Sequence, residues 1–101
     1  MTPASAIMLN EAEQRFEWSV NGHLAYAQFE RLPGAMAYTH VVVPQALGGQ
    51  GVGSALVRHI LDHAAQHQLK VRPDCPFVKA YIDRHPAYQA LSLAHGANLA
   101  P

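Results

Sequence analysis

The sequence has little charge and no long apolar run. Only 14% of its 101 residues are charged, and seven basic side chains balance seven acidic ones. A nucleic-acid-binding surface normally needs an excess of basic residues, so we expect no nucleic-acid partner. No apolar stretch approaches the roughly 18 residues of a membrane-spanning helix, and the N-terminus lacks the basic and apolar regions of a signal peptide. We therefore expect no membrane partner.

Cysteine is almost absent. The single cysteine, Cys75, excludes an internal disulfide and fits a reducing compartment, so a cytoplasmic location is expected. Metal-ligating clusters are also lacking. His59, His63 and His67 recur every four residues, and neighbouring members could chelate a metal, but they fall on the polar side of a predicted helix without a partner cluster. We predict a solvated helix face and no metal site.

Half of the residues are hydrophobic, which is typical of a globular domain. The length fits a single domain over residues 1–101, with frayed ends at about 1–6 and 97–101. Residues 15–20 alternate between polar and apolar, Asn21-Gly22 is a strong hairpin signal, and residues 23–32 form the returning strand. After a turn at Pro33-Gly34, residues 35–43 are apolar on both faces, as in a central strand that is covered on each side.

The periodicity changes after residue 53. Apolar residues at helical spacing predict a helix that ends near Gln68, followed by a short strand at 69–72 that runs parallel to 35–43. Pro76 suits the first position of a helix over 77–84 and makes Cys75 its N-cap; another short helix follows at 86–91. The fold class is therefore α+β: an antiparallel β-meander followed by a helix, a parallel-type strand and C-terminal helices.

Residues 41–53 connect the apolar strand to the helix through a cluster of glycines. Glycine lets a ligand approach the backbone closely, and the first amides of a helix have no intrahelical partner, so this stretch is a candidate phosphate site. Two common phosphate loops are excluded: a dinucleotide fingerprint starting at Gly51 would need glycine at Leu56, and a P-loop would need a lysine after the glycines. The alternative is a helix cap with nothing bound.

Two residues are candidates for catalysis. A thiol at a helix N-terminus, such as Cys75, can be activated as a nucleophile, although the charge of Asp74 opposes this and a buried capping cysteine is the alternative. His40 lies just before three valines in the apolar strand and could act as a general base, or be a core histidine. Tyr81 and Tyr88 could donate a proton to a leaving thiolate, but their spacing also suits packing.

The glycine stretch Gly48-Gly49-Gln50-Gly51-Val52-Gly53 resembles the coenzyme A pyrophosphate loop of the GNAT superfamily of N-acetyltransferases, with Gly48 in place of the usual leading Arg or Gln. Two later segments narrow the resemblance: residues 70–78, which contain a Pro-Asp-Cys-Pro-Phe-Val motif, and His85-Pro86-Ala87-Tyr88. Together they are similar to the minimal GNAT-like family of very small N-acetyltransferases, over nearly the whole chain.

This resemblance implies a minimal GNAT fold with acetyl-CoA as the acetyl donor. It implies that pantetheine lies along the strand backbone, that the pyrophosphate lies on the loop amides, and that the thioester points toward His40 and Cys75. The implied catalytic residues are Cys75 and His40. The implied cofactor-binding residues are Val41, Val42, Val43, Gly48, Gly49, Gln50, Gly51, Val52 and Gly53.

The implied reaction moves an acetyl group to an amine, which could belong to a protein lysine, a polyamine or a small molecule. The amine could attack the thioester directly, with His40 or a water taking its proton, or Cys75 could carry the acetyl group first. One alternative is a non-catalytic binding module for coenzyme A or acyl-CoA, and another is a purely structural interaction domain.

Overall fold

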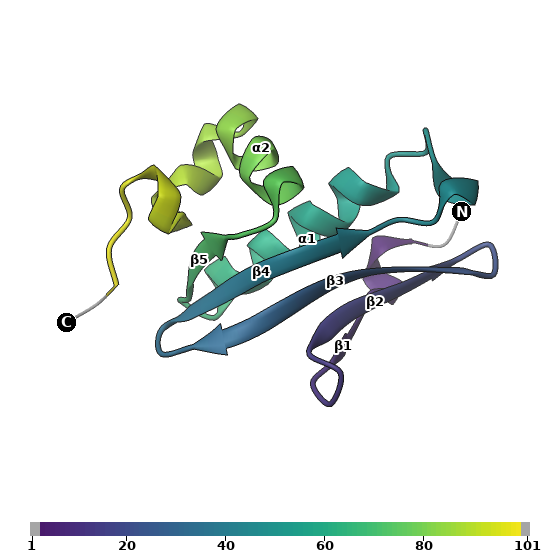
Figure 1. Ribbon diagram of the computed structural model, residues 1–101, viewed down its shortest axis with the longest axis horizontal. Helices are drawn as coiled ribbons and strands as arrows, with labels where there is room; N and C mark the ends of the chain where they lie inside the picture. Colours follow the sequence, from purple (N-terminus) through teal and green to yellow (C-terminus); the bar gives the residue numbers. More distant parts are fainter. Residues whose placement is uncertain (1–2, 100–101) are drawn as a thin grey trace.

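The sheet has five strands in the order β1-β2-β3-β4-β5, so each strand lies beside its neighbours in the sequence (Figure 1). The computed structural model describes residues 3–99. The first four strands are antiparallel and β5 is parallel to β4, which confirms the predicted α+β fold with a meander and a parallel last strand. The strands are β1 (Met8–Asn10), β2 (Arg15–Val20), β3 (His23–Leu32), β4 (Ala35–Val42) and β5 (Lys70–Pro73).

The β2–β3 hairpin turns at Asn21 and Gly22, as predicted. Both have positive φ angles, 51° and 79°, which a two-residue type I′ turn requires and which asparagine and glycine tolerate. The resulting register puts Phe16 and Trp18 of β2 in the core, opposite Ala27 and Ala25 of β3.

Two α-helices cover one face of the sheet. Helix α1 (Val52–Gln66) connects β4 to β5, and α2 (Pro76–Arg84) follows β5 with Pro76 in its first turn and Cys75 as N-cap, as predicted. The short 3-10 helices are η1 (Ala4–Ala6), η2 (Gln45–Leu47), η3 (Pro86–Leu91) and η4 (Leu93–His95). Part of the N-terminal end expected to fray is thus η1, while residues 1, 2, 100 and 101 lie outside the described residues. Within residues 3–99, no helix has the length and apolar content needed to cross a membrane.

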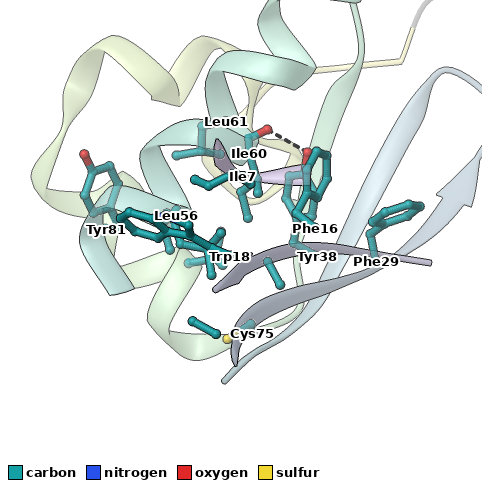
Figure 2. Close-up of a cluster of buried hydrophobic side chains, with 14 of the residues drawn as sticks. Ile7, Phe16, Trp18, Phe29, Tyr38, Leu56, Ile60, Leu61, Cys75 and Tyr81 are labelled. Carbon is teal, nitrogen blue, oxygen red and sulfur yellow. Dashed lines mark hydrogen bonds between the residues drawn. The ribbon is translucent and has the colours of Figure 1, made fainter. Parts of the chain in front are cut away.

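The core lies between α1, α2 and the covered face of the sheet (Figure 2). Tyr38 is completely buried there, and its hydroxyl donates a hydrogen bond of 2.7 Å to the carbonyl of Ile60 in α1. Burial raises the pKa of Tyr38, so this hydroxyl stays a donor. Because the bond joins the centre of β4 to the centre of α1, it fixes the helix on the sheet.

The histidine face of α1 is only partly solvated, contrary to the sequence prediction. The rings of His59 and His63 are half-buried and meet Phe16 edge-on, at centroid distances of 5.9 and 5.0 Å. His67 stacks on His63 at 4.1 Å. Burial lowers the pKa of both His59 and His63, so these residues are neutral packing groups near pH 7.

The expectation that residues 35–43 are covered on both faces is wrong for their second half. The register between β3 and β4 shifts at Gln28/Phe29, because Phe29 pairs with Tyr38 while Gln28 pairs with His40. Thr39 is therefore the extra residue of a β-bulge, which reverses the side-chain alternation that follows it. As a result His40 is exposed on the open face of the sheet, whereas Tyr38 before it is buried under the helices.

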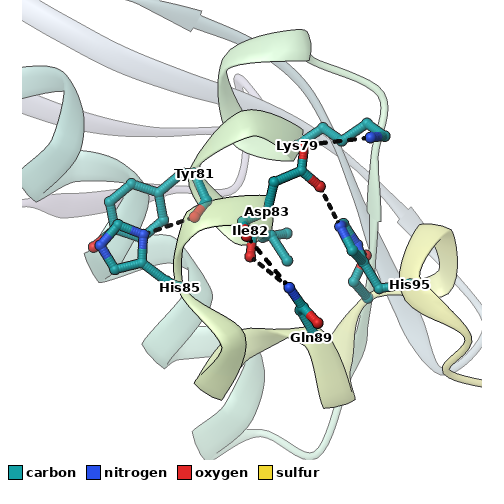
Figure 3. Close-up of polar contacts among 8 residues, drawn as sticks. Lys79, Tyr81, Ile82, Asp83, His85, Gln89 and His95 are labelled. Atoms are coloured by element: carbon teal, nitrogen blue, oxygen red, sulfur yellow. Dashed lines mark hydrogen bonds and ion pairs between the residues drawn. The ribbon is translucent and has the colours of Figure 1, made fainter.

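The C-terminal segment is attached to α2 by a chain of polar contacts (Figure 3). His95 in η4 bonds through Nδ1 to the Ser92 hydroxyl at 2.6 Å and through Nε2 to the Asp83 carboxylate at 2.5 Å. This hydrogen bond and the nearby Lys79 hold the pKa of Asp83 below its ordinary value. Ser92 is fully buried and unreachable by a substrate, so this Ser-His-Asp arrangement anchors the chain and is not a hydrolytic triad.

Candidate cofactor site

A cavity of about 440 Å³ lies where the end of β4 faces the start of α1. We call it the glycine-loop cavity. Its walls are mainly apolar side chains and bare glycine backbone, together with the hydroxyl-bearing Ser54, and include no titratable group. They comprise Val41, Val43, Leu47, Gly48, Gly49, Gly51, Val52, Gly53, Ser54 and Phe77.

Within residues 3–99, the structure records no hydrogen-bond acceptor for most backbone amides of the glycine loop. The last paired amides before the loop are those of Leu47 and Gly48 in η2, and the next is that of Ala55, which donates to Gly51 at 3.0 Å. In the described chain no protein acceptor is recorded for the amides of residues 49–54 between them. Unpaired amides at a helix N-terminus, together with the helix dipole, favour the binding of an anion such as a phosphate.

Two glycines are required by the shape of the loop. Gly51 is the N-cap of α1 with φ +75°, a left-handed conformation that side chains disfavour. Gly53 has an ordinary φ, but a Cβ atom there would lie 3.1 Å from Cζ of Phe77 and 3.5 Å from Val43 Cγ2. These positions keep the amides accessible and let Phe77 approach the helix.

A gap opens between β4 and β5 beside this cavity. The two strands pair from Ala35↔Lys70 to Tyr38↔Pro73, and β4 then continues to Val42 without a partner on its β5 side. Phe29 of β3 donates its amide toward the β2 side, to Gln14 at 2.9 Å. Because backbone groups alternate along a strand, the N–H and C=O groups of Gln28 and Tyr26 face β4, where these residues pair with His40 and Val42. Val41 lies between His40 and Val42, so its N–H and C=O point the other way, into the gap.

Cys75 lies at the closed end of the gap. Its amide donates a hydrogen bond of 2.9 Å to the carbonyl of Tyr38, immediately before the strands separate. Its side chain is only 6% exposed and packs within the hydrophobic core. Cys75 is therefore next to the gap, but it is not among the residues that line the glycine-loop cavity.

His40 is separated from both the gap and the glycine-loop cavity. The bulge at Thr39 directs its side chain to the open face of the sheet, where it lines a different hollow with Gln28 and Glu30. The structure thus places the two predicted catalytic residues on opposite sides of β4. Among residues 3–99, no three His, Cys, Asp or Glu side chains gather as a metal site would require.

The sequence matches the family described as GCN5-related N-acetyl-transferase over residues 15–91. The chain belongs to this family. The fold agrees: the solution structure of a "GCN5-like putative N-acetyltransferase" from Staphylococcus aureus is similar, with a TM-score of 0.67 and 28% sequence identity over 88% of this chain and 90% of that chain. The family resemblance noted in the sequence is therefore confirmed. The glycine-loop cavity thus belongs to a protein of an acetyltransferase family.

In this member of the family the predicted cofactor-binding residues lie together, except for two. Val42 points to the open face and is 39% exposed, and Gln50 is exposed at the tip of the loop. Leu47, Ser54 and Phe77 also line the cavity and were not predicted. Phe77 was visible in the sequence only as part of the Pro-Asp-Cys-Pro-Phe-Val motif, because its contact with Gly53 depends on how α2 packs against α1.

Tyr81 and Tyr88 lie away from the glycine-loop cavity. The ring of Tyr81 stacks on His85 at 3.9 Å, and Tyr81 lines a hollow on the far side of α1 with Arg58 and His59. The Tyr88 hydroxyl donates to Asp62 at 2.7 Å, and its burial, reinforced by that carboxylate, raises the pKa of Tyr88 to about 12. Neither side chain lines the glycine-loop cavity.

Proposed function

We propose that this chain is an acetyl-CoA-dependent N-acetyltransferase that moves an acetyl group to an amine. The observation that carries the proposal is the run of unpaired amides at residues 49–54, which begins α1 beside the unpaired end of β4. The pyrophosphate of coenzyme A would accept from these amides. The pantetheine chain would lie in the gap and exchange hydrogen bonds with the backbone of Val41.

The geometry supports a specific place for the thioester. With pantetheine in the gap, the acetyl group would lie near its closed end, at the carbonyl of Tyr38 and the amide of Cys75. An amine would attack the carbonyl carbon there, and the thiolate of coenzyme A would leave. Cys75 is the nearest nucleophilic side chain, and we propose that it either accepts the acetyl group or handles the proton of the leaving thiol.

Native mass spectrometry with acetyl-CoA tests the binding step. Gly51→Val adds a side chain within the loop and should abolish the acetyl-CoA adduct. Gly22→Val is a matched control, because Gly22 and Gly51 have nearly the same φ (+79° and +75°) and neither Cβ would meet an atom within 4 Å. Both variants should lose similar stability, while only Gly51→Val loses binding. Undiminished binding by Gly51→Val would refute the cofactor site.

A non-catalytic binding module for coenzyme A or acyl-CoA is the second candidate. It is favoured by one observation, namely that no titratable side chain lines the glycine-loop cavity. Release of free coenzyme A thiol, measured in the presence of a panel of amines, separates the two. An enzyme releases the thiol in proportion to acetylated amine, whereas a module binds acetyl-CoA and leaves it intact.

A further inference from the structure

The glycine-loop cavity offers no charged side chain to a ligand. Among residues 3–99, its lining includes no lysine, arginine, histidine or carboxylate. The nucleotide half of coenzyme A carries most of the charge of that molecule, including a 3′-phosphate, and proteins usually hold such phosphates with arginine or lysine. The walls of the cavity therefore do not match the nucleotide half.

The first cation after the glycine loop is Arg58, and it lines a separate hollow. That hollow lies on the far side of α1 and includes Asp62 and Tyr81, and of the residues that line either hollow only Ser54 borders both. The Arg58 side chain is 72% exposed and faces Asp62 at 3.9 Å, so water and a carboxylate already surround it. An ion pair at such an exposed site changes an affinity by less than about fivefold.

Two backbone features of the cavity match a smaller ligand. The unpaired amides at residues 49–54 suit a phosphate. The N–H and C=O of Val41 point into the adjoining gap, where they suit a peptide-like amide in an extended chain. The volume of about 440 Å³ lies in the lower part of the range for ligand sites, which is roughly 300–1,000 Å³.

Phe77 adds an apolar surface that the protein leaves uncovered. Its side chain is 43% exposed in the first turn of α2. Phe77 and Val43 both lie beside Gly53, since a Cβ atom there would be 3.1 Å from the ring and 3.5 Å from Val43 Cγ2. A branched apolar group of a ligand would cover the exposed ring and remove apolar area from water.

Resting on the proposed function, we infer that the donor is recognised through its acetyl-4′-phosphopantetheine unit and not through its nucleotide. In this unit a phosphate is followed by a dimethyl-substituted carbon, two amides and the thioester. The phosphate accepts from the loop amides, the methyl groups cover Phe77, and an amide pairs with Val41. The same unit occurs in coenzyme A and on acyl carrier proteins, so both can present it.

The acetyl transfer itself does not involve the nucleotide. The amine forms a C–N bond to the thioester carbonyl carbon, the C–S bond breaks, and one proton from nitrogen goes to the departing thiolate. The products are an N-alkylacetamide and the phosphopantetheine thiol, which remains attached to its carrier. The carrier therefore affects how the donor binds and not which bonds change.

A series of ligands tests this inference by calorimetric titration. The ligands are coenzyme A, dephospho-coenzyme A, 4′-phosphopantetheine and adenosine 3′,5′-bisphosphate. We expect the first three to bind within about fivefold of one another and the bisphosphate to bind at least about a hundredfold more weakly than coenzyme A. A loss of about tenfold or more on removal of the 3′-phosphate, or tight binding of the bisphosphate, would overturn the inference.

Two substitutions assign the contacts. Phe77→Ala should weaken coenzyme A and 4′-phosphopantetheine by the same factor, about tenfold, while Phe77→Leu should retain most of the affinity. Leu24→Ala is the matched control, because Leu24 is 41% exposed on β3 and does not line the cavity. Arg58→Gln should leave the affinity of every ligand unchanged. A loss in Arg58→Gln that affects coenzyme A but not 4′-phosphopantetheine would show that the nucleotide is recognised.

Kinetics distinguish the two sources of the unit. Acetyl-CoA and an acyl carrier protein that bears acetyl-4′-phosphopantetheine are compared as donors to one amine, with free acetyl-4′-phosphopantetheine as the reference. We expect the free unit to be turned over, and the carrier with the higher kcat/KM identifies the source. Turnover of acetyl-CoA without turnover of the free unit would overturn the inference.

The outcomes separate this inference from the proposed function. Failure of all four ligands to bind would overturn the cofactor site and the inference together. Binding of coenzyme A without binding of 4′-phosphopantetheine would overturn the inference and leave the acetyltransferase standing. Binding of every pantetheine-bearing ligand without thiol release from any donor would overturn the acetyltransferase and support recognition of the unit by a binding module.

Discussion

The amide of Cys75 donates to the carbonyl of Tyr38 at 2.9 Å, at the point where β4 and β5 separate. This one bond ties the start of α2 to the centre of the sheet. It also fixes where the gap ends, because beyond Tyr38 the backbone of β4 on that side meets no strand. The position of the only cysteine is therefore set by the same contact that closes the proposed pantetheine channel.

The burial of Cys75 leads to a prediction about its reactivity. Because the side chain is only 6% exposed, iodoacetamide should alkylate it much more slowly in the folded protein than in urea, and coenzyme A should slow the reaction further. Intact-mass measurements follow this directly. If Cys75 carries the acetyl group, incubation with acetyl-CoA should add an acetyl mass that hydroxylamine removes and that Cys75→Ala lacks. A hydroxylamine-stable acetyl group, or none, would leave direct transfer as the mechanism.

Gly53→Ala should narrow the glycine-loop cavity. The new Cβ would lie 3.1 Å from Cζ of Phe77, so the half-exposed ring must shift. We expect acetyl-CoA affinity to fall about five- to tenfold, while a helical Gly→Ala exchange keeps the free energy of unfolding within about 1 kcal/mol. Calorimetric titration measures the affinity. Phe77→Leu in the same chain should restore it, and a failure to do so would mean that the ring is not the obstacle.

Stability should decrease as the pH falls below about 6.5, the ordinary histidine pKa. Burial lowers the pKa of His59 and His63 in the folded protein, so the unfolded chain binds protons more readily in this range and unfolding becomes easier. His67 and Arg31 add to the lowering at His63, while Glu11 and Asp62 oppose it at His63 and His59 respectively. Above this range both histidines are neutral in the folded and the unfolded state, so they do not make the free energy of unfolding depend on pH.

Urea denaturation at pH 7.5 and 5.5 measures this effect. The double variant His59→Gln/His63→Gln should show a smaller loss of stability between the two pH values than the parent protein. His23→Gln, an exposed histidine in the β2–β3 hairpin, is the control and should behave like the parent. An equal pH dependence in all three proteins would show that the two helix histidines are not the titrating groups.

Ser92→Ala should destabilise the C-terminal segment. The hydroxyl of Ser92 is fully buried and bonds to Nδ1 of His95, so its removal leaves the ring nitrogen without this partner. We expect a loss of about 1–2 kcal/mol in the free energy of unfolding, measured in urea. Ser19→Ala, at an exposed serine of β2, should cost little. Unchanged acetyl-CoA affinity in Ser92→Ala would confirm that the contact anchors η4 and does not act on the cofactor site.

The sequence predicted the features that depend on local chemistry. Asn21 and Gly22 have the conformational freedom that the hairpin needs, and Pro76 starts a helix because its missing N–H costs nothing there. The apolar face of α1 and the glycine loop were equally readable from spacing. The half-burial of His59 and His63 was not, because it depends on Phe16, more than 40 residues earlier in the chain.

The site could be predicted only on one side of β4. Apart from Phe77, the cavity residues lie within residues 41–54, so their proximity is local. The fate of His40 depends on whether β3 and β4 pair residue for residue, and an irregular pairing leaves no mark in either strand alone. The contacts among Ser92, His95 and Asp83 were missed for a similar reason, because they join η4 to α2, a separate helix that comes earlier in the sequence.

The bulge at Thr39 makes the pairing of β4 as important as its composition. If β3 and β4 paired residue for residue, with Thr39 opposite Gln28, then β4 would present His40 to the helices and Val41 to solvent, with Val42 turned inward. The glycine loop would then begin from the other side of the strand, and a histidine would replace a valine in the hydrophobic interior. A shift of one residue in the pairing, which alters no chemical group, would thus exchange the contents of the two faces of the sheet.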